Sequence, residues 1–268
     1  MSEKRLQGLR VAVLAVDGFE QVEVTIPMRA LRREGADVRI VSLRPGRIRG
    51  MNFLFRGKKL PVDDLVSRAQ PEEYGALLLP GGFVNPDLLR QSKQARDFVR
   101  QFDAMERPIA TLCHGPEVLI SAGLVKGRRL TSWPGIADDI RNAGGTWEDS
   151  AAVRDRNWVA SRSPLDMIPF CQAMIDLFDE AGVRDLAPAP RRVRYVARLT
   201  HVATLAAMAT AVVAGRAAFR SVGPKRLSIG LLSGAALVAA GARIFAPRAR
   251  NTRQMGLAPD VRERRAAA

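Results

Sequence analysis

The amino-acid sequence predicts an α/β protein with a doubly wound parallel sheet, followed by a separate helical segment at the C-terminus. Short, almost continuously apolar runs such as residues 9–16 and 76–79 suit strands that are buried on both faces. Stretches of ten to fifteen residues with helical periodicity alternate with these runs, as a parallel sheet requires. Residues 188–268 hold 15 basic and 2 acidic residues, whereas residues 1–187 hold 27 and 25. We therefore expect a near-neutral domain over 1–187 and a different kind of segment after it.

The expected elements follow in chain order. Glycines at 46, 50 and 57 and weak helical periodicity predict a β-hairpin within residues 44–64. The apolar residues Val24, Met28 and Leu31 recur at the spacing of a helix that packs on the core. The remaining expectations are strands at 9–16, 36–43, 76–79 and 108–112, shorter strands within 128–132 and 147–159, and helices at 22–33, 92–103, 117–122, 135–143 and 164–178.

Three loops with chemically useful residues follow strands of the predicted sheet. They are residues 17–20 after the first strand, Gly81 and Gly82 after the third, and Cys113 and His114 after the fourth. The carboxyl ends of parallel strands meet at one edge of a sheet, and ligands bind there in open α/β folds. The sequence therefore predicts a single functional site at this edge.

Cys113 is the candidate nucleophile of that site. A strand, a tight turn and a helix start meet there, and backbone N–H groups together with a helix N-terminus favour the thiolate. A lone cysteine can equally be a small buried apolar residue. His114 is the one histidine within residues 1–187, so it is the available imidazole base, unless it faces away from Cys113.

Carboxyl and backbone groups complete the predicted site. Glu20 is the expected partner of the Cys113 sulfur, either donating to the thiolate or moving a proton; the alternative is a capping role at the next helix. Glu23 has the same two interpretations, and we expect it to be structural. The backbone N–H groups of Gly81, Gly82 and His114 are expected to form an oxyanion hole, although the two glycines also suit a simple turn.

Composition excludes several other classes of protein. Two cysteines, Cys113 and Cys171, do not make a disulfide framework, so we expect a reducing, cytoplasmic environment for the domain. Cys171 is expected in the core. The histidines and cysteines show no metal-ligand spacing, and no cofactor is expected. The polar N-terminus does not resemble a signal peptide.

An ordered set of motifs resembles the ThiJ/PfpI family, in its PfpI-type intracellular protease and protein deglycase branch of the class I glutamine amidotransferase-like superfamily. The resemblance covers about residues 10–178. Its motifs are Phe-Glu-Gln-Val-Glu at 19–23, Leu-Pro-Gly-Gly at 79–82, Asn-Pro-Asp at 85–87, Cys-His-Gly-Pro at 113–116, Thr-Ser-Trp-Pro-Gly at 131–135, Asp-Asp at 138–139, Asn-Ala-Gly at 142–144 and Asn-Trp-Val-Ala-Ser-Arg at 157–162.

The resemblance implies a flavodoxin-like sandwich in which Cys113 is the nucleophile, with Glu20 and His114 beside it. It implies a peptidase, glyoxalase-like or deglycase activity on carbonyl adducts or modified protein, and a homo-oligomer. In such oligomers an acidic residue of the neighbouring subunit completes a triad, and Asp87 stands near its position. Glutaminase activity is not expected, because no histidine occurs between His114 and His201. A non-catalytic redox or stress-sensing module that uses Cys113 is the alternative.

The C-terminal segment is expected to decide where the domain acts. Within residues 188–250, a basic linker precedes two Ala-rich apolar runs at 199–219 and 227–246, each near the length that spans a bilayer. We expect a membrane hairpin that attaches a cytoplasmic domain to the inner membrane. The alternative is an oligomerising or partner-binding helix pair. Residues 251–268 are expected to be a disordered basic tail. The apolar runs argue against nucleic-acid binding.

Overall fold

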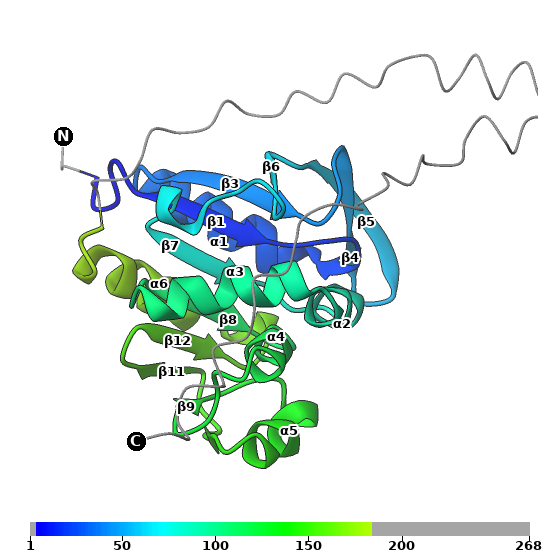
Figure 1. Cartoon of the computed structure of the whole chain (residues 1–268), viewed down its shortest axis with the longest axis vertical. Coiled ribbons are helices and arrows are strands. Elements are labelled where there is room, and N and C mark those ends of the chain that lie inside the picture. Colours follow the sequence, from blue (N-terminus) through cyan, green and yellow to red (C-terminus); the bar gives the residue numbers. More distant parts are fainter. Residues whose placement is uncertain (1–3, 184–268) are drawn as a thin grey trace, which may run out of the picture. The chain divides into compact units, whose positions relative to one another are not determined.

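A seven-stranded sheet runs through residues 4–183, which are the part of the chain that the computed structural model describes (Figure 1). Neighbouring strands are parallel except at the edge, where β11 and β12 are antiparallel. The strand order is β11 (Ala152–Asp155), β12 (Trp158–Ser161), β8 (Ile109–Leu112), β7 (Ala76–Leu79), β1 (Arg10–Leu14), β3 (Asp37–Ser42) and β6 (Asp64–Leu65). The predicted α/β class and mostly parallel sheet are confirmed.

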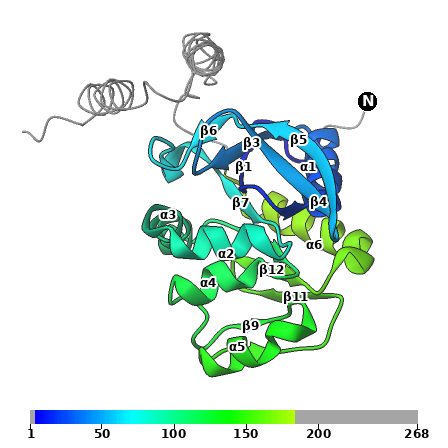
Figure 2. The same ribbon diagram turned by 90° about the vertical axis from the view of Figure 1, so that its right-hand side faces the viewer.

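Helices cover both faces of this sheet (Figure 2). Helices α1 (Gln21–Arg33) and α6 (Met167–Glu180) pack on one face, and α2 (Val84–Gln91), α3 (Lys93–Ala104) and α4 (Pro116–Ser121) on the other. Side chains of β1 alternate accordingly, since Val11 and Val13 join the first core and Ala12 and Leu14 join the second. The apolar runs of the sequence thus supply two cores, one on each side of the sheet.

Short elements complete the fold. Strands β2 (Phe19–Glu20), β4 (Arg47–Asn52) and β5 (Phe55–Pro61) form a three-stranded sheet, in which β4 and β5 make the predicted hairpin. The two-residue strand β2 was not expected; it pairs with β4 directly before α1 begins. Strands β9 (Arg129–Leu130) and β10 (Thr146–Trp147) pair with each other, and α5 (Ala137–Asn142) lies between them in sequence.

The order of the strands reverses between β1 and β7. From β1 the chain passes to β3 and β6 on one side, then returns to β7 on the other side and continues to β8. Such a reversal opens a crevice at the carboxyl ends of the strands. No helix was expected between Gly82 and residue 92. The structure instead begins helix α2 at Val84, so this part of the crevice wall is helical.

Two predictions about the C-terminal segment lie outside the described residues. These are the membrane hairpin with its linker over residues 188–250 and the disordered tail at 251–268. Within residues 4–183, none of the helices combines the length and the apolar character that a membrane crossing needs.

Candidate active site

Cys113 occupies a constrained position at the carboxyl end of β8. Its φ of 58° lies in the left-handed region, which is uncommon and strained for a residue other than glycine. Two backbone hydrogen bonds hold it there: its N–H donates to the Ser161 carbonyl (3.0 Å), and its carbonyl accepts from the Trp133 N–H (2.9 Å). The residue is 7% exposed. The side chain is therefore nearly buried at the carboxyl end of β8.

Glu23 is the carboxyl group beside this sulfur. It lies in the first turn of α1 and is fully buried. Its Oε2 accepts a hydrogen bond from the Gly81 N–H (2.7 Å), and its carboxyl group is within hydrogen-bonding reach of Cys113. The other oxygen, Oε1, has no nitrogen or oxygen partner among the described residues.

The expectation that Glu20 partners Cys113 does not match the geometry. Glu20 belongs to β2, and its Oε2 accepts a hydrogen bond from the Phe53 N–H (2.9 Å) at the tip of the β4–β5 hairpin. The pairing of β2 with β4 turns this side chain toward the hairpin. Glu23, which we expected to be structural, lies three residues further along, on the face of α1 that points into the fold.

Burial controls the protons of this pair. Loss of solvent raises the pKa of Glu23 to about 8, while the bonds from Gly81 and Cys113 act in the opposite direction. Glu23 is therefore mostly protonated at neutral pH. Burial also raises the pKa of the Cys113 thiol, and a charged Glu23 raises it further. A protonated Glu23 has the opposite effect, because it can donate to the thiolate. Glu23 and Cys113 are therefore not both ionised, because two buried negative charges side by side cost more free energy than one.

Backbone N–H groups supply the remaining polarity around the sulfur. Those of Gly82 and His114 point at the Cys113 sulfur and favour its thiolate. The N–H of Gly81, expected in the oxyanion hole, is instead occupied by Glu23. Gly81 also has no room for a side chain, since a Cβ there would lie 2.8 Å from the Cys113 Cβ and from Glu23 Oε2. Gly82 and His114 therefore remain as the candidate oxyanion donors.

The imidazole of His114 lies against the sulfur and between aromatic rings. Its Nδ1 is 3.2 Å from the Cys113 Sγ. Its ring lies 4.9 Å from the ring of Phe83 and stacks with Trp133 at 6.0 Å, measured between centroids. Loss of solvent lowers the pKa of His114, so the ring is neutral near pH 7. A neutral imidazole can accept or donate one proton at the site.

Asn85 and Asp87, which follow Gly82 in the sequence, have different roles. Asn85 is fully buried; its side chain accepts from the Val16 N–H (2.8 Å) and donates to the Pro80 carbonyl (2.9 Å). It thereby ties the end of β1 to the end of β7. Asp87 is exposed on α2, where its carboxylate accepts from Gln91 (3.1 Å). Its expected role across a subunit interface stays a prediction.

The other cysteine is not part of this site. Cys171 lies in α6, half-buried against the first core, and burial raises its pKa to about 11. It lies at the margin of the core, and not inside it as expected. Among residues 4–183 there is no group of three or more His, Cys, Asp and Glu side chains that could hold a metal ion.

Comparison with known proteins assigns the family. Residues 9–177 match the DJ-1/PfpI family. The chain belongs to this family. A deglycase of Pyrococcus abyssi is 40% identical over 169 residues, which are 63% of this chain and 99% of the relative. Protein/nucleic acid deglycase 2 of Escherichia coli is 36% identical over 166 residues, covering 60% of this chain and 92% of the relative.

A solved DJ-1/PfpI structure supports the same assignment. It is a two-domain protein of Anabaena variabilis with a DJ-1/ThiJ/PfpI-like and a ferritin-like domain. It superposes with a TM-score of 0.58 at 30% identity, over 68% of this chain and 50% of that one. The predicted family is therefore confirmed, and the flavodoxin-like DJ-1/PfpI fold with it.

Proposed function

We propose that this chain is a cysteine-dependent hydrolase of the deglycase or glyoxalase-like type, acting on carbonyl adducts. The observation that carries the proposal is the surroundings of Cys113. A mostly protonated carboxyl group, Glu23, and two backbone N–H groups, from Gly82 and His114, converge on a sulfur in a left-handed turn. The curated relatives that are named deglycases support the same reaction class.

The geometry suits an aldehyde substrate with a neighbouring carbonyl group. The thiolate of Cys113 attacks the aldehyde carbon, and Glu23 protonates the oxygen, which gives a hemithioacetal. Glu23, now a carboxylate, removes the proton from the former aldehyde carbon. That proton returns at the neighbouring carbon, and the hydroxyl proton passes to the neighbouring oxygen, which leaves a 2-hydroxy thioester. Water then cleaves the thioester, releasing a hydroxy acid and the thiol. The sequence of steps adds one water molecule and needs no oxidant or cofactor.

The walls of the site favour small or protruding substrates. Cys113 is 7% exposed and the rings of Phe83 and Trp133 stand beside His114. A small aldehyde, or an adduct at the end of a long side chain, reaches a nearly buried sulfur more readily than an extended peptide backbone does. This supports deglycase or glyoxalase-like activity over general peptidase activity.

Replacement of Cys113 tests the proposal. We expect Cys113→Ala to abolish glyoxal consumption by the full chain while the protein stays folded, because the substitution removes the sulfur and leaves the backbone bonds of the turn in place. Cys171→Ala is the matched control, since it removes the thiol outside the site, and it should retain turnover. Unchanged turnover in Cys113→Ala would sink the proposal.

We also propose a homo-oligomer in which Asp87 of a neighbouring subunit reaches the site. Helix α2 exposes Asp87 together with the apolar residues Phe83, Val84 and Leu88, which are 54%, 48% and 40% exposed. Sedimentation should then show more than a monomer, and Asp87→Asn should lower turnover without changing sedimentation. A monomer with full activity would contradict this assembly.

Attachment of the domain to a membrane remains our proposal for residues 199–219 and 227–246. It rests on the length of the two apolar runs and on their basic flanks. Fractionation of cells that produce the full chain or residues 1–187 tests it. Recovery of both proteins in the soluble fraction would contradict the attachment and favour a helix pair that binds protein.

Redox sensing is the second candidate. The N–H groups of Gly82 and His114 that point at the sulfur would also bind the oxygen of a Cys113 sulfenic acid, formed with release of water from peroxide. Mild peroxide should then modify Cys113 before Cys171 in mass spectra. Equal or reversed reactivity argues against this role.

A further inference from the structure

Positive charge is concentrated on one part of the described domain. Helix α1 and the β4–β5 hairpin, residues 21–33 and 47–61, carry eight Arg and Lys residues and one acidic residue, the buried Glu23. The other residues within 4–183 comprise 18 basic and 22 acidic residues. The two segments are therefore strongly basic, while the rest of the described domain has a net negative charge.

These eight basic side chains also differ from the others in their pairing. Of the 18 basic residues elsewhere in the described chain, 13 form an ion pair. None of the eight does so with a described residue; they are Arg29, Arg32, Arg33, Arg47, Arg49, Arg56, Lys58 and Lys59. Their charge is uncompensated within residues 4–183.

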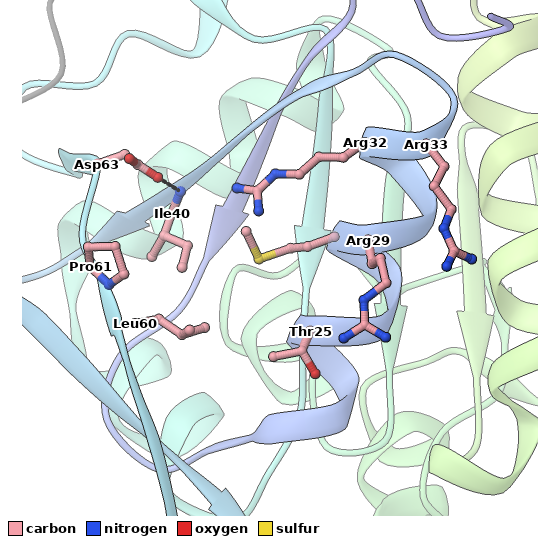
Figure 3. A pocket seen from close by; sticks show the side chains of 9 residues that line it. Thr25, Arg29, Arg32, Arg33, Ile40, Leu60, Pro61 and Asp63 are labelled. Atoms are coloured by element: carbon pink, nitrogen blue, oxygen red, sulfur yellow. Dashed lines mark hydrogen bonds between the residues drawn. The ribbon is translucent and has the colours of Figure 1, made fainter.

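A groove of about 490 Å³ lies between α1, β3 and β5, and three of the eight basic residues line it: Arg29, Arg32 and Arg33 (Figure 3). Arg32 reaches across it toward Ile40 and Asp63, Arg29 lies along α1 beside Thr25, and Arg33 is at the edge. Arg32 donates one hydrogen bond to the Val38 carbonyl (3.0 Å), which fixes the guanidinium and leaves its other donors available.

The rest of the groove is apolar. Met28, Ile40, Leu60 and Pro61 line it, and Asp63, its one acidic residue, accepts a hydrogen bond from the Ile40 N–H (2.9 Å). Like charges three and four residues apart destabilise a helix. The helix dipole favours Arg32 and Arg33 in the last turn, but it does not account for Arg29 one turn earlier. A bound anion would offset the repulsion among these arginines.

We propose that this groove binds a phosphate monoester with an apolar body, at a site separate from Cys113. The three arginines and Asp63 leave a charge of two, which a phosphate monoester near pH 7 compensates. Guanidinium groups of arginine bind phosphate through paired hydrogen bonds. The apolar body of the ligand packs over Met28, Ile40 and Leu60. A soluble metabolite and a phospholipid headgroup share this chemistry.

Calorimetric titration of the full chain with phenyl phosphate tests the site. We expect Arg29→Gln with Arg32→Gln to weaken binding by about tenfold or more, the loss that follows when charge-assisted hydrogen bonds are removed. The matched control is Arg68→Gln with Lys126→Gln, which removes two exposed charges outside the groove. An equal loss in the control, or binding within twofold of the wild type in the groove variant, would overturn the proposal.

Further binding experiments test the apolar body and the phosphate group of the ligand separately. Leu60→Ser should weaken phenyl phosphate and leave inorganic phosphate unchanged; equal effects would overturn the apolar contact. Cys113→Ser should not alter phenyl phosphate binding, and the groove variant should keep glyoxal turnover, so failure of this site is distinguishable from failure of the proposed reaction. Competition by phosphatidic acid vesicles would identify a lipid headgroup as the source, and competition by soluble esters alone a metabolite.

Discussion

Replacing Glu23 by glutamine should make the protein more stable at alkaline pH while it loses activity. Burial holds the pKa of Glu23 at about 8, against 4.5 for an unburied glutamate. Between these two values the folded state binds a proton that the unfolded state has released, so stability falls as pH rises. The difference corresponds to about 5 kcal/mol lost between pH 4.5 and pH 8. A glutamine at this position stays neutral throughout and avoids this loss.

The assay is urea denaturation of the wild type and Glu23→Gln at pH 5 and pH 9. The two proteins share their other titrating groups. The change in the free energy of unfolding from pH 5 to pH 9 therefore differs between them only through position 23. We expect the wild type to lose several kcal/mol more than the variant. Glyoxal turnover should fall by about 10²–10⁴-fold, the usual loss when a general acid–base group is removed.

Parallel pH dependence in the two proteins would refute this reasoning. It would mean that Glu23 has the same protonation in the folded and unfolded states, and that it is not the proton carrier proposed for the site.

The remaining predictions concern the geometry around the sulfur. Glu20→Gln should retain turnover within a few-fold, and a loss as large as that of Glu23→Gln would restore Glu20 as the partner of Cys113. Gly81→Ala should destabilise the protein by about 3 kcal/mol in urea denaturation, because a Cβ would clash with Cys113 and Glu23. Gly123→Ala, which meets open space at positive φ, should cost only about 1 kcal/mol. Asn85→Ala should cost about 2–4 kcal/mol, since it leaves the Val16 N–H and the Pro80 carbonyl without their partner, and a smaller cost would show that water replaces the amide.

The order of strands and helices could be read from the sequence because local periodicity determines it. The apolar runs and the glycines at 46, 50 and 57 predicted the sheet and the hairpin correctly. Helix α2 was missed, since Asn85-Pro86 is typical of a turn; here Pro86 falls in the first turn of the helix, where proline is tolerated.

The residues predicted for the site lie at the carboxyl edge of the sheet, but the carboxyl group beside Cys113 is that of Glu23 and not that of Glu20. The choice between Glu20 and Glu23 depended on where α1 begins and on the pairing of β2, whose partner residues in β4 lie 31 positions further along the chain. One signal was available: Glu23, Pro27 and Leu31 follow one another at the spacing of a buried helix face. A carboxylate at a core position of a helix indicates a functional group more strongly than one in a loop.

The site draws its parts from three strands that are distant in sequence. Glu23 follows β1, Gly82 follows β7 and Cys113 follows β8, and these strands are adjacent only when the sheet is complete. A chain emerging from the ribosome, or one that has lost a strand to heat or proteolysis, carries an ordinary thiol. The proposed reaction therefore requires the complete sheet, because only the complete sheet brings Glu23, Gly82 and Cys113 together.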